Sequence, residues 1–196
     1  SNMQGDTFLS ESMAQYSALM AMAKEYGKDH IRTFLKYEGD KYQNARGSEA
    51  LGETPLLTVE NQGYIHYNKA SVMLYNLRSF LGEDTLNSAF RSLVDNFGYV
   101  DPPWPTSLDW YRAVQQVTPD SLDYLLEDDI KYITLYDNKM IESKAKMNAD
   151  STWTVTMKMT AEKAHADSLC KGTSIPMTDW MSIDVERWRS LAKDKR

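Results

Sequence analysis

The sequence predicts an α+β fold that is mainly α, made of helical hairpins followed by a small antiparallel β-domain that is expected to be cut short. Two observations carry this prediction. Apolar residues recur three and four positions apart from Phe8 to Ile130, which is the period of a helix. After Asp129 the period falls to two, which is typical of a strand with one buried face. With 196 residues, of which 42% are hydrophobic, the chain is long enough to build a core of its own.

The first predicted helix runs from Phe8 to Tyr26, and Thr7 or Ser10 is expected to cap its start. Gly27 is a suitable stop, because glycine tolerates the backbone conformations that end helices. Asp29 is expected to open a second helix, so that the two form a hairpin. The apolar faces of this hairpin are Phe8, Leu9, Met13, Tyr16, Leu19, Met20 and Ala23 on the first helix, and Ile31, Phe34, Leu35 and Tyr42 on the second.

Residues 47–63 predict a loop with one extended piece at Leu-Leu-Thr-Val. A second helical hairpin follows, with its break at Gly82. The three prolines in Tyr-Val-Asp-Pro-Pro-Trp-Pro-Thr-Ser, residues 99–107, require a non-helical connector. Thr106 or Ser107 then caps a helix that reaches Val117, and Pro119 starts another short helix. The apolar positions of the second hairpin are Val72, Met73, Leu77, Phe80, Leu81, Leu86, Phe90, Leu93 and Val94.

The alternating stretch from Thr152 to Thr160 predicts a strand whose one face carries Trp153, Val155, Met157 and Met159. The turn 148–151 joins it to a strand from Met140 to Met147, and Ile175 to Val185 offers a third strand. We therefore divide the chain into four parts. Residues 1–6 are a cleavage scar and disordered start, 7–130 the helical part, 131–185 a β-strand appendage packed on it, and 186–196 a charged tail.

Composition excludes several classes of partner. The formal charge of −6 argues against nucleic acid and against direct membrane contact, because both surfaces attract clusters of Lys and Arg. A single cysteine, Cys170, excludes an internal disulfide and a cysteine-only metal site. No apolar run reaches the ~18–20 residues of a membrane span. Ser1 and Asn2 before Met3 resemble the scar of a cleaved expression tag, so the compartment is unknown from this sequence.

No local motif supplies a complete active site. H-E-x-x-H, G-x-S-x-G, the P-loop and the dinucleotide fingerprint are all absent. His30 and His165 are expected to be exposed or packed, and Cys170 to be inert. Two stretches stand out, Leu9–Tyr16 and Gly63–Ser71. On the residues alone, the helix dipole accounts for Glu11 near a helix start, and packing accounts for Tyr67.

A family resemblance gives these stretches another interpretation. Leu-Ser-Glu-Ser-Met-Ala-Gln-Tyr, residues 9–16, resembles the segment L-N-E-G-F-A-x-Y of the membrane alanyl aminopeptidases and related gluzincin zinc metallopeptidases. His-Tyr-Asn-Lys-Ala-Ser, residues 66–71, resembles the Y-x-K-G stretch of the same family. The amino-acid sequence as a whole is most similar to a bacterial subgroup in which the peptidase is joined to an ABC transporter permease.

The resemblance implies that Glu11 is the third zinc ligand and that Tyr67 is the catalytic residue that stabilises the oxyanion. Tyr64 and His66 are candidate substrate-binding residues. The part from Phe8 to Ile130 corresponds to the second half of the peptidase domain, and the tail to the start of a β-sandwich that follows in some members. The parent protein would then be a zinc aminopeptidase, a hydrolase that removes N-terminal residues from peptide substrates.

Two departures from the family pattern stand out. Ser12 and Ala70 occupy positions where the family has glycine. The H-E-x-x-H half of the site is absent from this sequence. The fragment alone is therefore expected to be inactive and to hold no zinc, and its natural partner would be the missing N-terminal half of the peptidase domain. Self-association is expected through Met13, Met20, Met22 and Met73, which would lie exposed without that half.

The alternative is a helical binding or scaffold module, a degenerate peptidase fold associated with a membrane transporter. In this hypothesis a groove lined by Tyr64, Tyr67, Tyr75 and Trp104 recognises a protein or peptide. A helical domain without a ligand is a third hypothesis. The metal content of the longest parent protein separates the first hypothesis from the other two.

Overall fold

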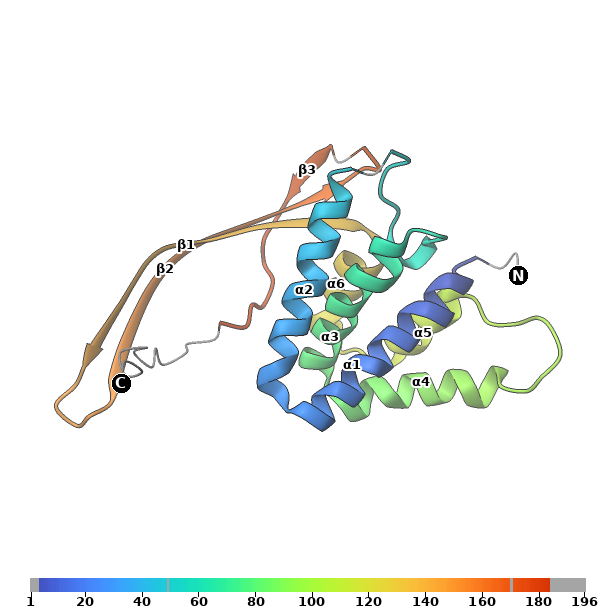
Figure 1. Cartoon of the computed structure of the whole chain (residues 1–196), viewed down its shortest axis with the longest axis horizontal. Coiled ribbons are helices and arrows are strands. Elements are labelled where there is room, and N and C mark those ends of the chain that lie inside the picture. Colours follow the sequence, from blue (N-terminus) through green and yellow to red (C-terminus); the bar gives the residue numbers. More distant parts are fainter. Residues whose placement is uncertain (1–3, 49, 170, 184–196) are drawn as a thin grey trace, which may run out of the picture.

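A computed structural model describes residues 4–48, 50–169 and 171–183 of the chain. It has a body of packed helices, from which two long strands, β1 and β2, extend as a curved ribbon (Figure 1). The architecture is α+β and mainly α, as predicted. The predicted tail 186–196 and Cys170 lie outside the described residues.

The first helical hairpin is confirmed, with an unexpected start. A π-helical turn, Phe8–Ser12, runs into helix α1, Met13–Tyr26. Gly27, with φ of 87°, separates α1 from helix α2, Lys28–Arg46. Neither predicted cap forms, because the chain is already helical before Phe8, so that the Ser10 hydroxyl bonds the carbonyl oxygen of Asp6 (2.9 Å) instead of a helix N–H group.

The second hairpin is also confirmed. Helices α3, Ala70–Leu81, and α4, Glu83–Phe97, are separated by Gly82. A second π-helical turn, Tyr64–Lys69, precedes α3. The extended piece predicted at Leu-Leu-Thr-Val is wrong: Leu56–Thr58 form a 3₁₀ turn. Its three-residue period buries Leu56 and Val59 on the same side.

Helix α5, Ser107–Val117, follows the proline-rich connector and starts at Thr106, one of the two predicted caps. The Thr106 backbone N–H donates to the Asp109 carboxylate (2.8 Å), half of a capping box. The predicted short helix after Pro119 is a 3₁₀ turn, Asp120–Leu122, followed by α6, Asp123–Leu126. A third π-helical turn, Glu127–Lys131, leads into the sheet.

The core lies between these helices. Phe8 and Trp110 are fully buried and meet edge to face, with ring centroids 4.7 Å apart. The prediction that four methionines lie exposed is wrong. Met13, Met20 and Met73 are half-buried against the core, and Met22 is also half-buried. The helical body therefore covers these side chains itself.

The sheet is antiparallel, in the order β1-β2-β3. Strand β1, Ile133–Met147, begins before the predicted Met140. It pairs with β2, Trp153–Ala166, through the predicted turn 148–151. The third strand was predicted in the wrong place, since β3 spans Gly172–Ile175 and pairs with the end of β2 near the body. Residues 176–183 have no strand partner and lie against helices. Val185, the predicted end of the strand, lies outside the described residues.

Among the described residues, no helix combines the length and apolar character needed to cross a membrane.

Candidate active site

The two stretches singled out in the sequence meet in space. The Tyr67 hydroxyl donates a hydrogen bond to the Glu11 carboxylate, across 56 positions of sequence. Glu11 lies on the π-helical turn Phe8–Ser12, and Tyr67 on the π-helical turn Tyr64–Lys69. Because π-helical turns are rare and occur frequently at functional sites, their pairing here marks a candidate site.

Ser12 joins the two turns. Its hydroxyl is fully buried and donates to the backbone carbonyl oxygen of His66 (2.7 Å). Ser12 stands where the family pattern has glycine, and no local motif predicts this bond. The hydroxyl fixes the backbone next to Glu11 against the backbone next to Tyr67, so the serine contributes a contact that glycine lacks.

The electrostatics of the pair follow from this hydrogen bond. The hydrogen bond to Glu11 raises the pKa of Tyr67, and partial desolvation and the Glu11 charge act in the same direction. Tyr67 therefore stays protonated at neutral pH and keeps an O–H to donate. Its side chain is 38% exposed, so the pair faces solvent and a bound molecule can reach it.

His66 packs beside Tyr67, with ring centroids 4.4 Å apart in an edge-on arrangement. Burial lowers the pKa of His66, and the Glu11 charge opposes this only in part. The imidazole is therefore neutral at pH 7. Its Nδ1 is buried and has no hydrogen-bond partner in the described part of the chain. Of the two predicted substrate-binding residues, His66 lies at the site.

Tyr64, the other predicted substrate-binding residue, points elsewhere. It is buried and stacks on Tyr42 of α2, with ring centroids 6.1 Å apart. The ring therefore forms part of the packing between α2 and the turn before α3.

A buried ionic group lies behind this turn. Glu53 accepts hydrogen bonds from Lys69 (2.8 Å), Arg46 (2.5 Å) and Tyr42 (2.8 Å). Burial would raise the pKa of Glu53, but these three donors outweigh burial and hold the pKa below its usual range. Sequence analysis missed the group, since Glu53 sits in an irregular loop without periodicity. It anchors Lys69, which lies two residues after Tyr67, to α2 and the loop.

The donors present do not fit a zinc ion by themselves. Protein zinc sites take three or four nitrogen, sulfur or oxygen ligands. Among the described residues, no group of three or more His, Cys, Asp or Glu side chains is placed to hold a metal ion. His30 is exposed, and His165 is packed against Tyr132 and bonded to Asp128 (2.8 Å). Glu11 is thus a single potential ligand.

The groove of the alternative hypothesis is not formed as predicted. Tyr67 is at the site described above, while Tyr75 lines a separate cavity against α6 and β1. Trp104 lies exposed in the proline-rich connector. The four aromatic residues therefore do not share a surface.

Comparison with protein-family descriptions, with curated proteins and with solved structures found no match for this chain.

Proposed function

We propose that the chain is part of a zinc aminopeptidase of the gluzincin type, to which it contributes Glu11 as a metal ligand and Tyr67 as the oxyanion-stabilising residue. The remaining ligands would come from polypeptide outside these 196 residues. The observation that supports the proposal most is the hydrogen bond between Tyr67 and Glu11, the two residues that the family resemblance selects. The resemblance rests on two short sequence segments only. The contact between Glu11 and Tyr67 in space is therefore independent support for the proposal.

The chemistry of the two side chains suits these roles. Tyr67 keeps its proton at neutral pH, because the hydrogen bond to Glu11 raises its pKa. When Glu11 engages a cation, the phenol O–H is released and can donate to a developing oxyanion on the substrate. One such donor typically contributes about 10²–10³-fold to turnover. The described residues form no group of three metal-binding side chains, so we expect the reaction to need the further ligands.

The test uses the full gene product. Its coding sequence is expected to place H-E-x-x-H about two dozen residues before Glu11. The purified protein should contain zinc and release aminomethylcoumarin from alanyl and leucyl substrates. Glu11→Gln should lose zinc and activity. Tyr67→Phe should keep zinc and lose about 10²–10³-fold in kcat.

Exposed residues provide matched controls. Glu25→Gln and Tyr26→Phe, at the far end of α1, should behave as wild type. Wild-type turnover in both Glu11→Gln and Tyr67→Phe would contradict the proposal, provided that the protein contains the histidine motif.

A helical binding or scaffold module is the second candidate. It is favoured by the ribbon that projects from the helices (Figure 1). A full gene product that lacks the histidine motif, binds no zinc and keeps the same fold would support this function over the first.

A further inference from the structure

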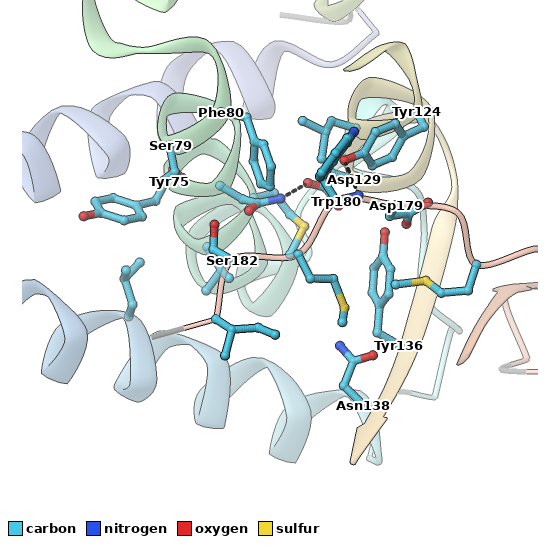
Figure 2. A pocket seen from close by; sticks show the side chains of 18 of the residues that line it. Tyr75, Ser79, Phe80, Tyr124, Asp129, Tyr136, Asn138, Asp179, Trp180 and Ser182 are labelled. Atoms are coloured by element: carbon cyan, nitrogen blue, oxygen red, sulfur yellow. Dashed lines mark hydrogen bonds between the residues drawn. The ribbon is translucent and has the colours of Figure 1, made fainter. Parts of the chain in front are cut away.

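A cavity of about 750 Å³ lies on another part of the molecule, between α2, α3, α6, β1 and the segment 177–183. Figure 2 shows its interior. None of the residues that line it belongs to the Glu11–Tyr67 site. Its size falls within the ~300–1,000 Å³ of pockets that take small organic molecules. Its wall combines acidic and aromatic side chains with several methionines.

The acidic part of the wall comes from the third π-helical turn and from the segment 177–183. Asp129 is 2% exposed, and one of its oxygens accepts from the Asn76 amide (2.8 Å). The Asp179 side chain is 4% exposed, and its Oδ1 accepts from Lys163 (2.7 Å). Its other oxygen, Oδ2, is buried and has no partner in the described part of the chain. A buried carboxylate oxygen without a donor is costly, and a ligand N–H would satisfy it.

Buried negative charge exceeds positive charge here. Lys163 is shared between Asp128 (2.6 Å) and Asp179 (2.7 Å), so one ammonium serves two carboxylates and Asp129 adds a third. Burial, together with the charges of Asp128 and Asp179, raises the pKa of Asp129 to about 7 despite the Asn76 hydrogen bond and the more distant Lys69. Arg32 of α2 also lines the cavity and adds a positive charge to its wall.

The aromatic part of the wall surrounds these carboxylates. In Figure 2 the hydroxyls of Tyr124 and Tyr136 point toward the region of Asp129 and Asp179. The Tyr124 hydroxyl also accepts from the backbone N–H of Trp180 (3.1 Å), which holds the outer segment in place. Phe80 lines the same cavity. Carboxylates surrounded by aromatic rings favour an organic cation, because the carboxylates attract positive charge and the rings bury an apolar body.

We propose that this cavity is a binding site for a small organic cation, a primary ammonium carried on an aromatic or alkyl body. The ammonium donates to Asp179 Oδ2 and to Asp129, and the body lies against Phe80, Tyr136 and Trp180. A bare metal ion fits less well, because the described residues here form no group of three metal-binding side chains. This site shares no residue with the proposed peptidase site, so the two proposals stand or fall separately.

The test compares 4-phenylbutylamine with 4-phenylbutanol, which has the same body without the charge. Isothermal titration on the 196-residue chain should show the amine binding about tenfold or more tightly than the alcohol, since hydrogen bonds to charged groups are the strong ones. In ¹⁵N-resolved spectra the amine should shift the amide and indole signals of Trp180. Asp129→Asn and Asp179→Asn should each weaken amine binding about tenfold, while Asp101→Asn in the exposed connector leaves it unchanged.

Circular dichroism checks the fold of each variant. Should both aspartate variants unfold, Trp180→Ala decides, because this side chain is 72% exposed and is not needed for the core. It should weaken amine binding about threefold. Equal binding of amine and alcohol would overturn the proposal. So would folded aspartate variants with wild-type affinity, an unaffected Trp180→Ala, or shifts confined to the ribbon.

Discussion

Two buried carboxylates show how differently this chain treats the same chemical group. Glu53 has three donors and is held ionised, since Lys69, Arg46 and Tyr42 surround it. Asp129 is equally buried but accepts a hydrogen bond from the neutral Asn76 amide (2.8 Å) instead of from a cation. Burying a charge without a paired cation is costly, so the two residues respond oppositely to pH. Glu53 stabilises the fold above its unfolded pKa, and Asp129 destabilises it as it ionises.

Asp129→Asn should make stability less dependent on pH. Burial raises the pKa of Asp129 from 3.8 to about 7, so between these values the folded chain binds more protons than the unfolded chain. The free energy of unfolding of the wild-type chain therefore falls as pH rises from about 4 to 7, because Asp129 ionises at a cost in the folded state. Asn keeps an acceptor for Asn76 without the charge. The variant should be about 4 kcal/mol more stable than wild type at pH 8, and equal to it near pH 4.

Urea denaturation at pH 4, 6 and 8 measures this difference. Asp101→Asn, in the exposed connector, is the control and should follow the wild-type curve at every pH. Parallel curves for Asp129→Asn and wild type would show that Asp129 does not titrate in this range.

At the scale of elements, the ribbon differs from the helices in what it buries. From Asp137 to Met147 every residue of β1 is exposed. Alternate residues of β2, Val155, Met157 and Met159, are half-buried, while Trp153 at the tip is exposed. The two-residue period is therefore confirmed, but the outer ribbon reaches beyond the helical body (Figure 1). It contributes little to the core.

Removing the outer ribbon should leave the body folded. Met140 pairs directly with Met159, so the dipeptide Asn-Gly can replace residues 141–158 and close a two-residue hairpin turn. The melting temperature should change by no more than about 3 °C, because few buried contacts are lost. Differential scanning calorimetry measures the change. The control is a shorter hairpin, in which Asn-Gly joins Asp137 to its partner Glu162, next to Lys163. This variant should destabilise the chain. Loss of a cooperative transition in the first variant would refute this view of the ribbon.

At the scale of the whole molecule, the ribbon carries exposed apolar side chains in addition to those scattered over the helical body. The methionines expected to be exposed are half-buried. Met140, Ile141, Met147 and Trp153 are each close to half exposed or more. Most of β2 beyond its pairing with β3 also has a free edge in the described sheet. Exposed apolar strands with unpaired edges favour pairing with another chain.

Self-association therefore stays a prediction, with a different surface assigned to it. Sedimentation velocity between about 5 and 200 μM should show a rising weight-average mass for the wild-type chain. The Asn-Gly ribbon variant should remain a monomer, since it lacks the apolar tip. A wild-type chain that is monomeric over this range would contradict the prediction. Equal association of both chains would place the interface elsewhere.

Much of the fold could be predicted because the residues that end its helices act through their own local backbone conformation. Gly27 and Gly82 end helices at the predicted positions, since a positive φ costs glycine little. The errors arose where one pattern has two physical causes. Residues 175, 177 and 179 alternate in burial as a strand would, yet 177–183 lie across helices and line a cavity. Leu56 begins a 3₁₀ turn and Val59 directly follows it, and both are buried; an apolar run does not distinguish this arrangement from a strand.

The sequence by itself determined the helical hairpins, the ribbon turn and the candidate pair Glu11 and Tyr67, because periodicity, glycine stops and short motifs are readable along the chain. Only the tertiary structure decided that Tyr67 bonds Glu11, that Ser12 ties their turns together, and that Asp129 and Asp179 share a cavity. These contacts join residues about 50 positions apart, and no local rule fixes which buried group meets which. Burial and charge pairing, which decide the chemistry of each side chain, exist only once the helices have packed.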